Sequence, residues 1–328
     1  MTTVSIPTSL RVAREGRLSR LWATNPPLVA LGFASIFLLA ITAILALADP
    51  RAITGAPAWV KPMKFAVSTV LYTFSLVWLL SFIQGRRRLV AVISWASTLA
   101  LVVELILIVL QVARGVASHF NYSTPLDAAI FSSMGAFIGL AWAMSLIAIV
   151  LLLRQRMSDG AFGWSLRLGL IAAALGMGLA FLMTAPNAAQ IAALQAGAGN
   201  GILGAHAVGV PDGGPGLPLL GWSIEGGDLR IAHFFGLHGL QILPLLGLAI
   251  SRLYATRLNP RRRALLVWTA GLGYLALVLG LAWQALRGQS IIHPDGLTLA
   301  VLAALIGAVA LAAGLIVFTA RPSEARHA

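Results

Sequence analysis

The chain has 328 residues, of which 59% are hydrophobic and only 10% are charged. A soluble domain carries about 25% charged residues, so a chain this long and this apolar is expected to lie in a lipid bilayer. The formal net charge of +13 does not indicate nucleic-acid binding, because the basic residues stand in short segments between apolar runs. The absence of cysteine excludes disulfides, thiolate metal sites, cysteine nucleophiles and c-type heme attachment.

Residues 1–27 form a polar, basic N-terminus that lacks the short apolar stretch and cleavage site of a removable signal peptide. A membrane-spanning helix needs about 20 mostly apolar residues. Eight later stretches meet this requirement: 28–48, 62–83, 89–113, 127–153, 167–186, 231–250, 264–285 and 297–319. The predicted fold class is therefore an all-α polytopic bundle of eight transmembrane helices.

The segments that flank the spans alternate in charge. One set, which includes both chain ends, holds 17 of the 23 basic residues: Arg11, Arg14, Arg17, Arg20, Arg86, Arg87, Arg88, Arg154, Arg156, Arg167, Arg252, Arg257, Arg261, Arg262, Arg263, Arg321 and Arg326. The other set holds the remaining six: Arg51, Lys61, Lys64, Arg114, Arg230 and Arg287. Because short cytoplasmic loops carry the excess of Lys and Arg, the first set and both termini are predicted to be cytoplasmic. The Ala/Leu/Arg-rich composition favours a bacterial inner membrane.

Two motifs recur along the chain. The third and seventh spans end in the same element, Gln111-Val-Ala-Arg114-Gly115 and Gln284-Ala-Leu-Arg287-Gly288. A histidine follows each element, His119 and His293. The second and sixth spans also begin alike, with Lys61 and Lys64-Phe65 matching Arg230 and His233-Phe234. The two offsets, 173 and 169 residues, are similar, which predicts an internal repeat.

The repeat predicts two four-helix halves in the same orientation, residues 28–153 and 167–319. A cytoplasmic linker, 154–166, joins them, and residues 320–328 form a cytoplasmic tail. The second half differs by a long outer loop, 187–229, which starts with a helix-like stretch and becomes rich in Gly and Pro. Loops of this length are usually functional or disordered. Because this one is partly apolar, we expect a cap over the outer mouth of the bundle.

Nearly all polar residues other than arginine fall on the predicted outer side. The candidate site residues are Lys61, Lys64, Glu104, Gln111, Arg114, His119, His206, Asp228, Arg230, His233, His238 and His293. Four aspartates could neutralise some of the six cations on this side: Asp49, Asp127, Asp228 and Asp295. Alternatively, the cations could hold an anionic ligand, such as heme propionates, a lipid phosphate or an isoprenoid diphosphate.

Glu104 lies about nine residues below the outer end of the third span, roughly 13 Å deep at a helical rise of 1.5 Å per residue. A carboxylate inside the membrane is costly and is a functional candidate by default. The alternative is a structural partner for a Lys or Gln on a neighbouring span. With His233 and Asp228, Glu104 completes the predicted set of acid–base residues.

The sixth span is the richest in polar side chains. His233 and His238 are its candidate metal ligands, although at 100° per residue they lie about 140° apart and are not expected to chelate one metal together. Each could ligate separately, or one could ligate while the other carries a proton. An interhelical hydrogen bond is the structural alternative for either histidine.

Eight spans in two four-helix halves, with a Gln-x-x-x-Gly element closing the third and seventh, resemble the heme A synthase family. The resemblance implies heme held by histidines of even-numbered spans near the outer face. It matches Gln111 and Gln284 to the repeated glutamine, and His233 or His238 to a ligand on the sixth span.

The chain departs from that family in two ways. Its second span offers Lys61 and Lys64 where the family has Glu and His, and its fourth and eighth spans carry no histidine. The resemblance therefore implies at most one heme, in the second half, with His293 or His206 as a second ligand. We do not predict a heme A synthase.

Three functions remain open from the sequence. The favoured one is a membrane oxidoreductase that binds heme b or a divalent metal ion on the outer side. The second is an enzyme that acts on a lipid or lipid-linked phosphate at the outer leaflet, and the third is a transporter. The expected partners are the bilayer and a lipid or quinone-like small molecule, without nucleic acid; the sequence does not define the oligomeric state.

Overall fold

The computed structural model describes residues 17–319, with side chains from residue 21 onward; the basic residues Arg11, Arg14, Arg321 and Arg326 lie outside the described residues. Eight helices are long and apolar enough to cross a membrane, which confirms the predicted all-α bundle. They are α2 (Pro26–Ala48), α3 (Val60–Leu80), α4 (Arg87–Ala113), α5 (Pro125–Leu153), α6 (Gly160–Leu179), α8 (Leu229–Leu253), α9 (Pro260–Leu286) and α10 (Gly296–Phe318).

The remaining elements are short. They are α1 (Arg17–Thr24), the 3-10 helix η3 (Ala180–Thr184) that prolongs α6, α7 (Ala188–Gln195), and the strands β1 (Ala52–Ile53), β2 (Ala56–Pro57), β3 (Ala207–Val208) and β4 (Gly227–Asp228). The antiparallel pair β1–β2 forms a hairpin between α2 and α3. The antiparallel pair β3–β4 ties the segment after α7 to the start of α8.

Side-chain caps define where several spans begin. Asn25, Thr124 and Asn259 each accept a backbone N–H from the first turn of α2, α5 and α9, and each of these helices carries Pro within its first two positions. Asp228 and Asp295 cap α8 and α10 in the same way. Such caps satisfy N–H groups that the helix itself leaves without partners.

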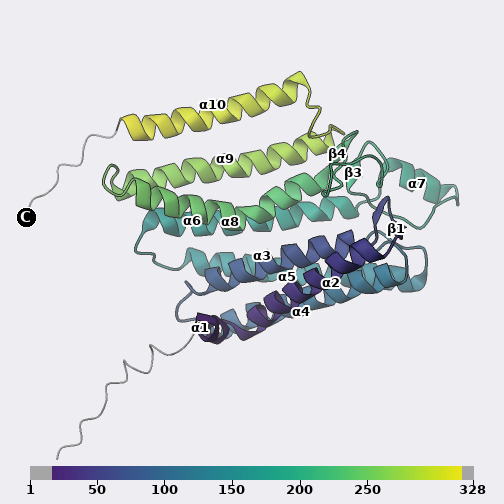
Figure 1. Ribbon diagram of the computed structural model, residues 1–328. Coiled ribbons are helices and arrows are strands. Elements are labelled where there is room, and N and C mark those ends of the chain that lie inside the picture. Colours follow the sequence, from purple (N-terminus) through teal and green to yellow (C-terminus); the bar gives the residue numbers. More distant parts are fainter. Residues whose placement is uncertain (1–16, 320–328) are drawn as a thin grey trace, which may run out of the picture.

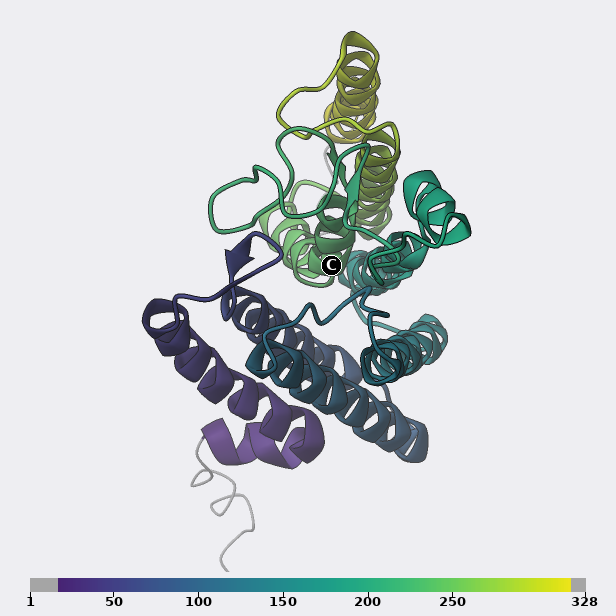
Figure 2. The same cartoon turned by 90° about the vertical axis from the view of Figure 1, so that its right-hand side faces the viewer.

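The helices run roughly parallel to one axis, with α2–α5 forming one half and α6, α8, α9 and α10 the other (Figures 1 and 2). The most extensive contact joins α6 and α8, where glycines allow the backbones to approach closely. A methyl group on Gly236 would come within 2.4 Å of Gly176 Cα, and one on Gly169 within 2.7 Å of the Gly239 carbonyl oxygen. Small residues serve this purpose between membrane helices.

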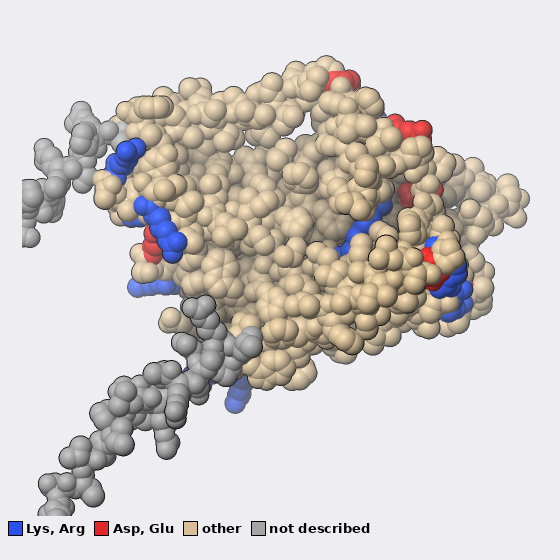
Figure 3. Space-filling model, viewed as in Figure 1, with Lys and Arg blue, Asp and Glu red and all other residues tan. Residues whose placement is uncertain are grey.

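Large apolar side chains cover the outside of the bundle. Leu47 is 92% exposed, Phe37 70% and Leu311 65%, and α10, which packs chiefly against α9, buries only Thr298. Figure 3 shows charged side chains near the two ends of the molecule, with a broad, almost uncharged region between them. Lipid is the solvent that suits such a surface, so the chain is a multi-pass membrane protein.

The two ends of the bundle differ. We call the end that carries β1–β2, the α4–α5 connection and residues 185–228 the cap end, and residues 185–228 the cap loop. The opposite end, at the α3–α4, α5–α6 and α8–α9 connections, is the arginine end. Seen onto the cap end, the cap loop leaves the second half and reaches toward the β1–β2 hairpin of the first (Figure 2).

The cap loop is tied to both halves. Tyr122 N–H donates to the Gly201 carbonyl oxygen over 2.6 Å, and Leu203 N–H donates to the Phe120 carbonyl oxygen over 2.8 Å. Gly213 packs on Gly55 of the hairpin so closely that a methyl group on Gly55 would lie 2.3 Å from the Gly213 carbonyl oxygen. The predicted helix-like stretch is α7, which Asn187 caps together with Gln190. The loop therefore lies across the ends of both halves.

The fifth span differs from its prediction. It was expected at 167–186 but begins at Gly160, because Asp159 accepts N–H groups from the first turn of α6. Arg167, assigned to a cytoplasmic loop, is instead buried in α6. Its guanidinium donates to the carbonyl oxygens of Leu152 and Gln155 at the end of α5, over 3.2 and 2.5 Å. This arginine therefore binds carbonyl groups that the end of α5 leaves without partners, a role that its charge alone did not predict.

Candidate functional site

Four of the six cap-end cations have an aspartate partner, the arrangement expected if aspartates neutralise them. The pairs are Arg51–Asp49 at 2.7 Å, Arg114–Asp127 at 2.6 Å, Arg230–Asp228 at 2.5 Å and Arg287–Asp295 at 2.5 Å. Hydrogen bonds from Arg51 and Arg287 hold the pKa of Asp49 and of Asp295 well below the usual range. Within residues 17–319, Lys61 and Lys64 lack such a partner.

The repeated Gln-x-x-Arg-Gly element has the same structure in both halves. Gly115 and Gly288 have φ of 76° and 74°, the left-handed conformation that ends a helix. The side-chain amide of Gln111 donates to the carbonyl oxygen of Ala117 over 3.5 Å, six residues on, and that of Gln284 donates to Ser290 over 2.9 Å, also six residues on. Both glutamines therefore stabilise a helix end, and neither is directed to a ligand.

The first pair of candidate acid–base groups joins α4 to the α4–α5 connection. Glu104 is 2% exposed, and its Oε1 lies 3.5 Å from Nε2 of His119. Its Oε2 is buried and has no hydrogen-bond partner in the part of the chain that the structure describes. Burial lowers the pKa of His119 well below 6.5, and Lys61 and His206 lower it further. The contact is therefore between a carboxyl group and a neutral imidazole.

The second pair belongs to the cap loop. Nδ1 of His206 lies 2.6 Å from Oδ2 of Asp212, whose carboxylate also accepts the backbone N–H groups of His206 and Ala207. Although burial opposes them, these hydrogen bonds lower the pKa of Asp212 to about 2. Burial lowers the pKa of His206, although the carboxylate of Asp212 acts to raise it. The aspartate therefore fixes a proton on Nδ1 and leaves Nε2 available.

Lys61 connects the two pairs. This side chain, half-buried at the start of α3, interacts electrostatically with Glu104 and Asp212. It also interacts with both histidines. No hydrogen bond of its ammonium group occurs within residues 17–319. We call Lys61, Glu104, His119, His206 and Asp212 the cap cluster.

Aromatic rings surround the cap cluster. Phe120 lies with its ring 4.8 Å from that of His206 and 6.1 Å from that of His119, between centroids. Phe65 and Phe131 flank His119 at 5.6 and 6.0 Å. An apolar enclosure strengthens electrostatic interactions inside it, because little water screens them.

Lys64 and Arg230 hold the apolar part of the cap loop. Lys64 Nζ donates to the carbonyl oxygen of Leu220 over 2.7 Å, and the Arg230 guanidinium donates to that of Gly221 over 2.6 Å. The Trp222 ring lies 6.2 Å from the ring of Phe234 on α8. The two cations, one from each half, therefore meet above the junction between α3 and α8.

The two histidines of α8 point to different neighbours, as their predicted separation requires. His233 Nδ1 lies 2.7 Å from the carbonyl oxygen of Gly176 on α6. His238 Nδ1 lies 3.3 Å from Oε1 of Gln241, whose amide donates to Ser75 Oγ on α3 over 2.8 Å. Both make the interhelical or intrahelical contacts of the structural alternative, and they do not form a joint metal site.

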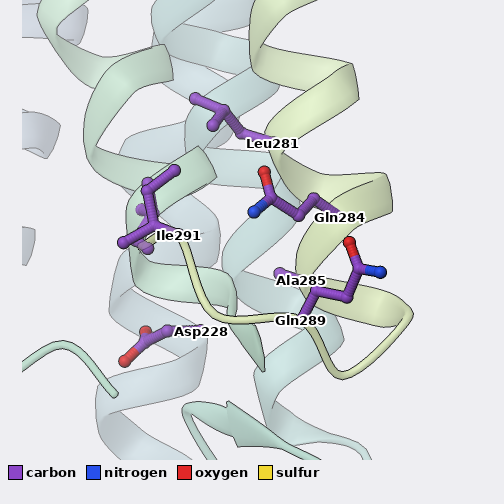
Figure 4. Close-up of a pocket in the computed structure, with 7 residues that line it drawn as sticks. Asp228, Leu281, Gln284, Ala285, Gln289 and Ile291 are labelled. Atoms are coloured by element: carbon purple, nitrogen blue, oxygen red, sulfur yellow. The ribbon is translucent and has the colours of Figure 1, made fainter. Parts of the chain in front are cut away.

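Asp228 and Gln284 line a narrow seam between α8, the end of α9 and the following loop (Figure 4). The empty space in this seam totals about 150 Å³, but no part of it is large enough to hold a water molecule. The Asp228 carboxylate, directed away from Gln284 in Figure 4, accepts the N–H of Ser223 and three groups of Arg230. Asp228 therefore has structural partners for both oxygens, and its predicted acid–base role gains no support.

Other predicted residues also lie apart from the cap cluster. His293 is exposed in the α9–α10 connection. Arg114, bound to Asp127 and Gln111, belongs to the helix-end element. Between residues 17 and 319, no group of three or more His, Asp or Glu side chains is arranged to hold a metal ion. Of the predicted site residues, the structure brings together Lys61, Glu104, His119 and His206.

The sequence analysis did not predict Asp212 as a member of the site. The available signal was its spacing: a carboxylate six residues after a histidine, in a loop whose glycines permit a tight return. Gly209 and Gly213 adopt positive φ on either side of the turn. Ser118, buried with its Oγ 3.1 Å from His119 Nδ1, was missed too.

Comparison of the chain with protein-family models, with curated proteins and with solved structures gave no match. The fold and the cap cluster thus define the class alone: a polytopic α-helical membrane protein with a partly buried group of ionisable residues at one end.

Proposed function

We propose that the chain is a membrane enzyme that uses the cap cluster as an acid–base centre to hydrolyse an ester bond of an anionic lipid. One observation carries the proposal: two histidines, each beside a carboxyl group, interact electrostatically with a lysine that has no hydrogen-bond partner within the described residues. Perturbed ionisable groups gathered in one place are typical of catalytic sites. The helix-end arginines, by contrast, are already neutralised.

Each member of the cluster has a role in this proposal. His206, oriented by Asp212, takes a proton from water at Nε2. The resulting hydroxide attacks the ester, and the bond to the leaving alcohol breaks. The alkoxide takes a proton from the Glu104–His119 pair, while the Lys61 ammonium neutralises charge on the attacked group. Water is added across the ester bond, so that one acid and one alcohol result.

We further propose that the cap end faces the outside of a bacterial inner membrane. The excess of arginine at the other end supports this orientation, because cytoplasmic loops retain basic residues. The substrate then comes from the outer leaflet, and both chain termini lie in the cytoplasm.

The test is turnover of lipid by purified protein. The full chain is reconstituted in nanodiscs that contain a bacterial polar lipid extract, and products are followed by mass spectrometry as the addition of water and the loss of one part of a lipid. His206→Ala removes the proposed base, and His293→Ala is the matched control on the same end of the bundle. Activity in wild type and in the control, with at least about a 100-fold loss in His206→Ala, supports the proposal.

No lipid product from the wild type, or equal activity in His206→Ala, contradicts it. Glu104→Gln tests the acid side without a change of shape. A folded variant is recognised by a thermal unfolding midpoint close to that of the wild type, so a loss of activity in such a variant is a loss of chemistry.

A heme- or metal-linked redox function is the second candidate, and one observation favours it. His206 and His233 each have Nδ1 engaged by an oxygen atom, which is the arrangement of most metal-ligating histidines and leaves Nε2 free to coordinate. Heme b or a divalent ion would be the cofactor, and a quinone-like molecule the electron partner. A Soret band or stoichiometric metal that disappears in His233→Ala would support it; their absence from the purified wild type would contradict it.

A further inference from the structure

A groove runs between α3 and α8, the two helices that meet where the halves join. It has a volume of about 290 Å³ and is lined by Ser68, Leu71, Tyr72, Phe234, Leu237, His238 and Gln241. Most of this lining is apolar. The volume counts space that is open to the surroundings, and only about 30 Å³ of it admits a water-sized sphere, so the groove is shallow and a ligand lies along it. The groove suits a narrow apolar chain better than a bulky head group.

Both ends of the groove are defined by hydrogen bonds. Towards the arginine end, the Gln241 amide on α8 donates to Ser75 Oγ on α3 and so links the two helices across the groove. Towards the cap end, Lys64 and Arg230 hold residues 220 and 221 over it. The groove is therefore open to the side and closed above and below.

The groove lining on α3 covers residues 68–72, and the path along this helix from Lys64 above the groove to Ser75 below it matches one leaflet. From Lys64 to Ser75 there are 11 residues, which is about 16 Å along α3 at 1.5 Å per residue. The hydrocarbon core of a bilayer is about 30 Å thick, so this distance is about half of it. The exposed apolar side chains of Val67 and Leu71 border the groove region, as expected for a surface in contact with lipid tails.

Among the residues that line or border the groove in the described chain, positive charge gathers at the cap end. Lys64 interacts electrostatically with Arg230, and Lys61 lies one helical turn above Lys64. Lys64 has no carboxylate within ion-pair distance in the described chain, so an anion can bind it without displacing an existing pair. Figure 3 shows basic side chains in the shaded hollow between the two halves.

We infer that the α3–α8 groove is the binding site for an anionic phospholipid of the leaflet at the cap end. One acyl chain lies in the groove from Lys64 down to the Gln241–Ser75 bond. The phosphate binds Lys64 at the edge of the cap loop. The phosphate ester bond to the head group then lies on the side of Lys61, whereas the acyl esters lie below Lys64. The inference rests on the proposed function for the identity of the substrate, but binding itself needs no turnover.

The test uses a photoactivatable probe. Phosphatidylglycerol with a diazirine in one acyl chain is placed at low density in phosphatidylcholine nanodiscs that hold the full chain, and labelled peptides are mapped by mass spectrometry. Labels on the groove-lining residues of α3 and α8 should exceed labels on the lipid-exposed helices α2 and α10 several-fold. Excess unlabelled phosphatidylglycerol should remove the groove labels, and excess phosphatidylcholine should not.

Two variants sharpen the result. Ser68→Trp fills the groove, and Ser133→Trp, at an exposed position of α5, is the matched control for a tryptophan on a membrane helix. Lys64→Gln removes the charge that binds the phosphate. Groove labelling should fall several-fold in Ser68→Trp and in Lys64→Gln and stay at the wild-type level in Ser133→Trp.

Three results would overturn the inference. Even labelling of all lipid-exposed helices would mean ordinary boundary lipid. Equal competition by phosphatidylcholine, or full labelling in Lys64→Gln, would mean a chain site without recognition of an anion. Displacement by a polyprenyl phosphate at concentrations where phosphatidylglycerol has no effect would mean a different anionic lipid.

The binding result and the catalytic result are separable. His206→Ala keeps the groove intact, so it should retain labelling and lose turnover. Groove labelling in a protein without any turnover would uphold the binding site and contradict the proposed function. Turnover without groove labelling would contradict the binding site alone.

Discussion

The two helix ends that carry the Gln-x-x-Arg-Gly element share a backbone structure but differ in the surroundings of the next histidine. Each ends in a left-handed glycine, each glutamine binds a carbonyl oxygen six residues on, and each arginine binds an aspartate of the next helix. After the first element, the side chain of His119 is 19% exposed and lies beside Glu104. After the second, His293 is exposed.

This difference indicates that the repeated element has a structural role at the helix end. The contact with the cap loop then distinguishes the copy whose histidine belongs to the cap cluster. The loop covers the first copy through hydrogen bonds to Phe120 and Tyr122, whose neighbour His119 it encloses. The second copy has the same helix end, and within residues 17–319 no comparable group of ionisable side chains contacts its histidine. Paired substitutions at equivalent positions can therefore separate structure from chemistry.

The largest expected difference is between His119→Ala and His293→Ala. Removal of a general acid–base group costs about 10²–10⁴-fold in rate, so lipid turnover should fall at least about 100-fold in His119→Ala and should not change in His293→Ala. The measurement is the initial rate of product formation in nanodiscs. Equal rates in the two variants would show that His119 takes no part in the chemistry.

The next largest difference is between Arg114→Gln and Arg287→Gln. Asp127, the partner of Arg114, has a side chain only 3% exposed, whereas Asp295, the partner of Arg287, is 41% exposed. A buried acceptor that loses a donor costs about 1–3 kcal/mol, while an exposed pair contributes little. Thermal unfolding in detergent should therefore show the lower midpoint for Arg114→Gln, and the reverse order would be inconsistent with the burial of Asp127.

Gly115→Ala and Gly288→Ala should have similar effects. Both positions have φ near +75°, and an added methyl group would make only ordinary van der Waals contacts, so the cost is conformational, about 1–2 kcal/mol in each case. The two unfolding midpoints should fall together. A clearly larger loss at one position would show that the two helix ends are not structurally equivalent.

The smallest expected effect is a dependence of folding stability on pH. Burial lowers the pKa of His119 and of His206, so the folded protein binds their protons more weakly than the unfolded chain does. The stability from these groups is fully present above the unfolded pKa near 6.5 and is lost as pH falls below it, by at most about 1 kcal/mol per histidine between pH 7 and 5.5.

Thermal unfolding midpoints measured across that interval check this dependence. The double variant His119→Gln, His206→Gln should show a flatter pH profile than the wild type, and His293→Gln should keep the wild-type profile. A double variant as acid-sensitive as the wild type would assign the dependence to other groups.

Most of the fold could be predicted from the sequence because long apolar runs leave few alternatives in a membrane. The predicted span boundaries agree with the helices within a few residues except at α6. There, Arg167 interrupts the apolar run of the sequence, so the predicted span began too late. In the structure the Arg167 guanidinium binds carbonyl oxygens inside the protein. A hydropathy value treats a charged side chain as if it faced lipid, because it contains no information about hydrogen-bond partners in the folded protein.

The site could be predicted only in part. Glu104 was identified because a carboxylate deep in a span is rare, and the histidines because they gather on one side. Their grouping depended on the path of the cap loop, which no periodicity describes. Asp212 joins His206 through a turn of six residues, and Lys61 approaches them only because α3 begins beneath that turn.

The order of the cap cluster along the chain has a consequence for biosynthesis. Lys61, Glu104 and His119 enter the membrane with the first half, whereas His206 and Asp212 emerge from the ribosome about 100 residues after Glu104. At about 5–20 residues per second, the first half waits many seconds with part of its cluster uncovered. A nascent chain that stops before the cap loop therefore already contains a membrane-embedded half, but holds no complete cluster.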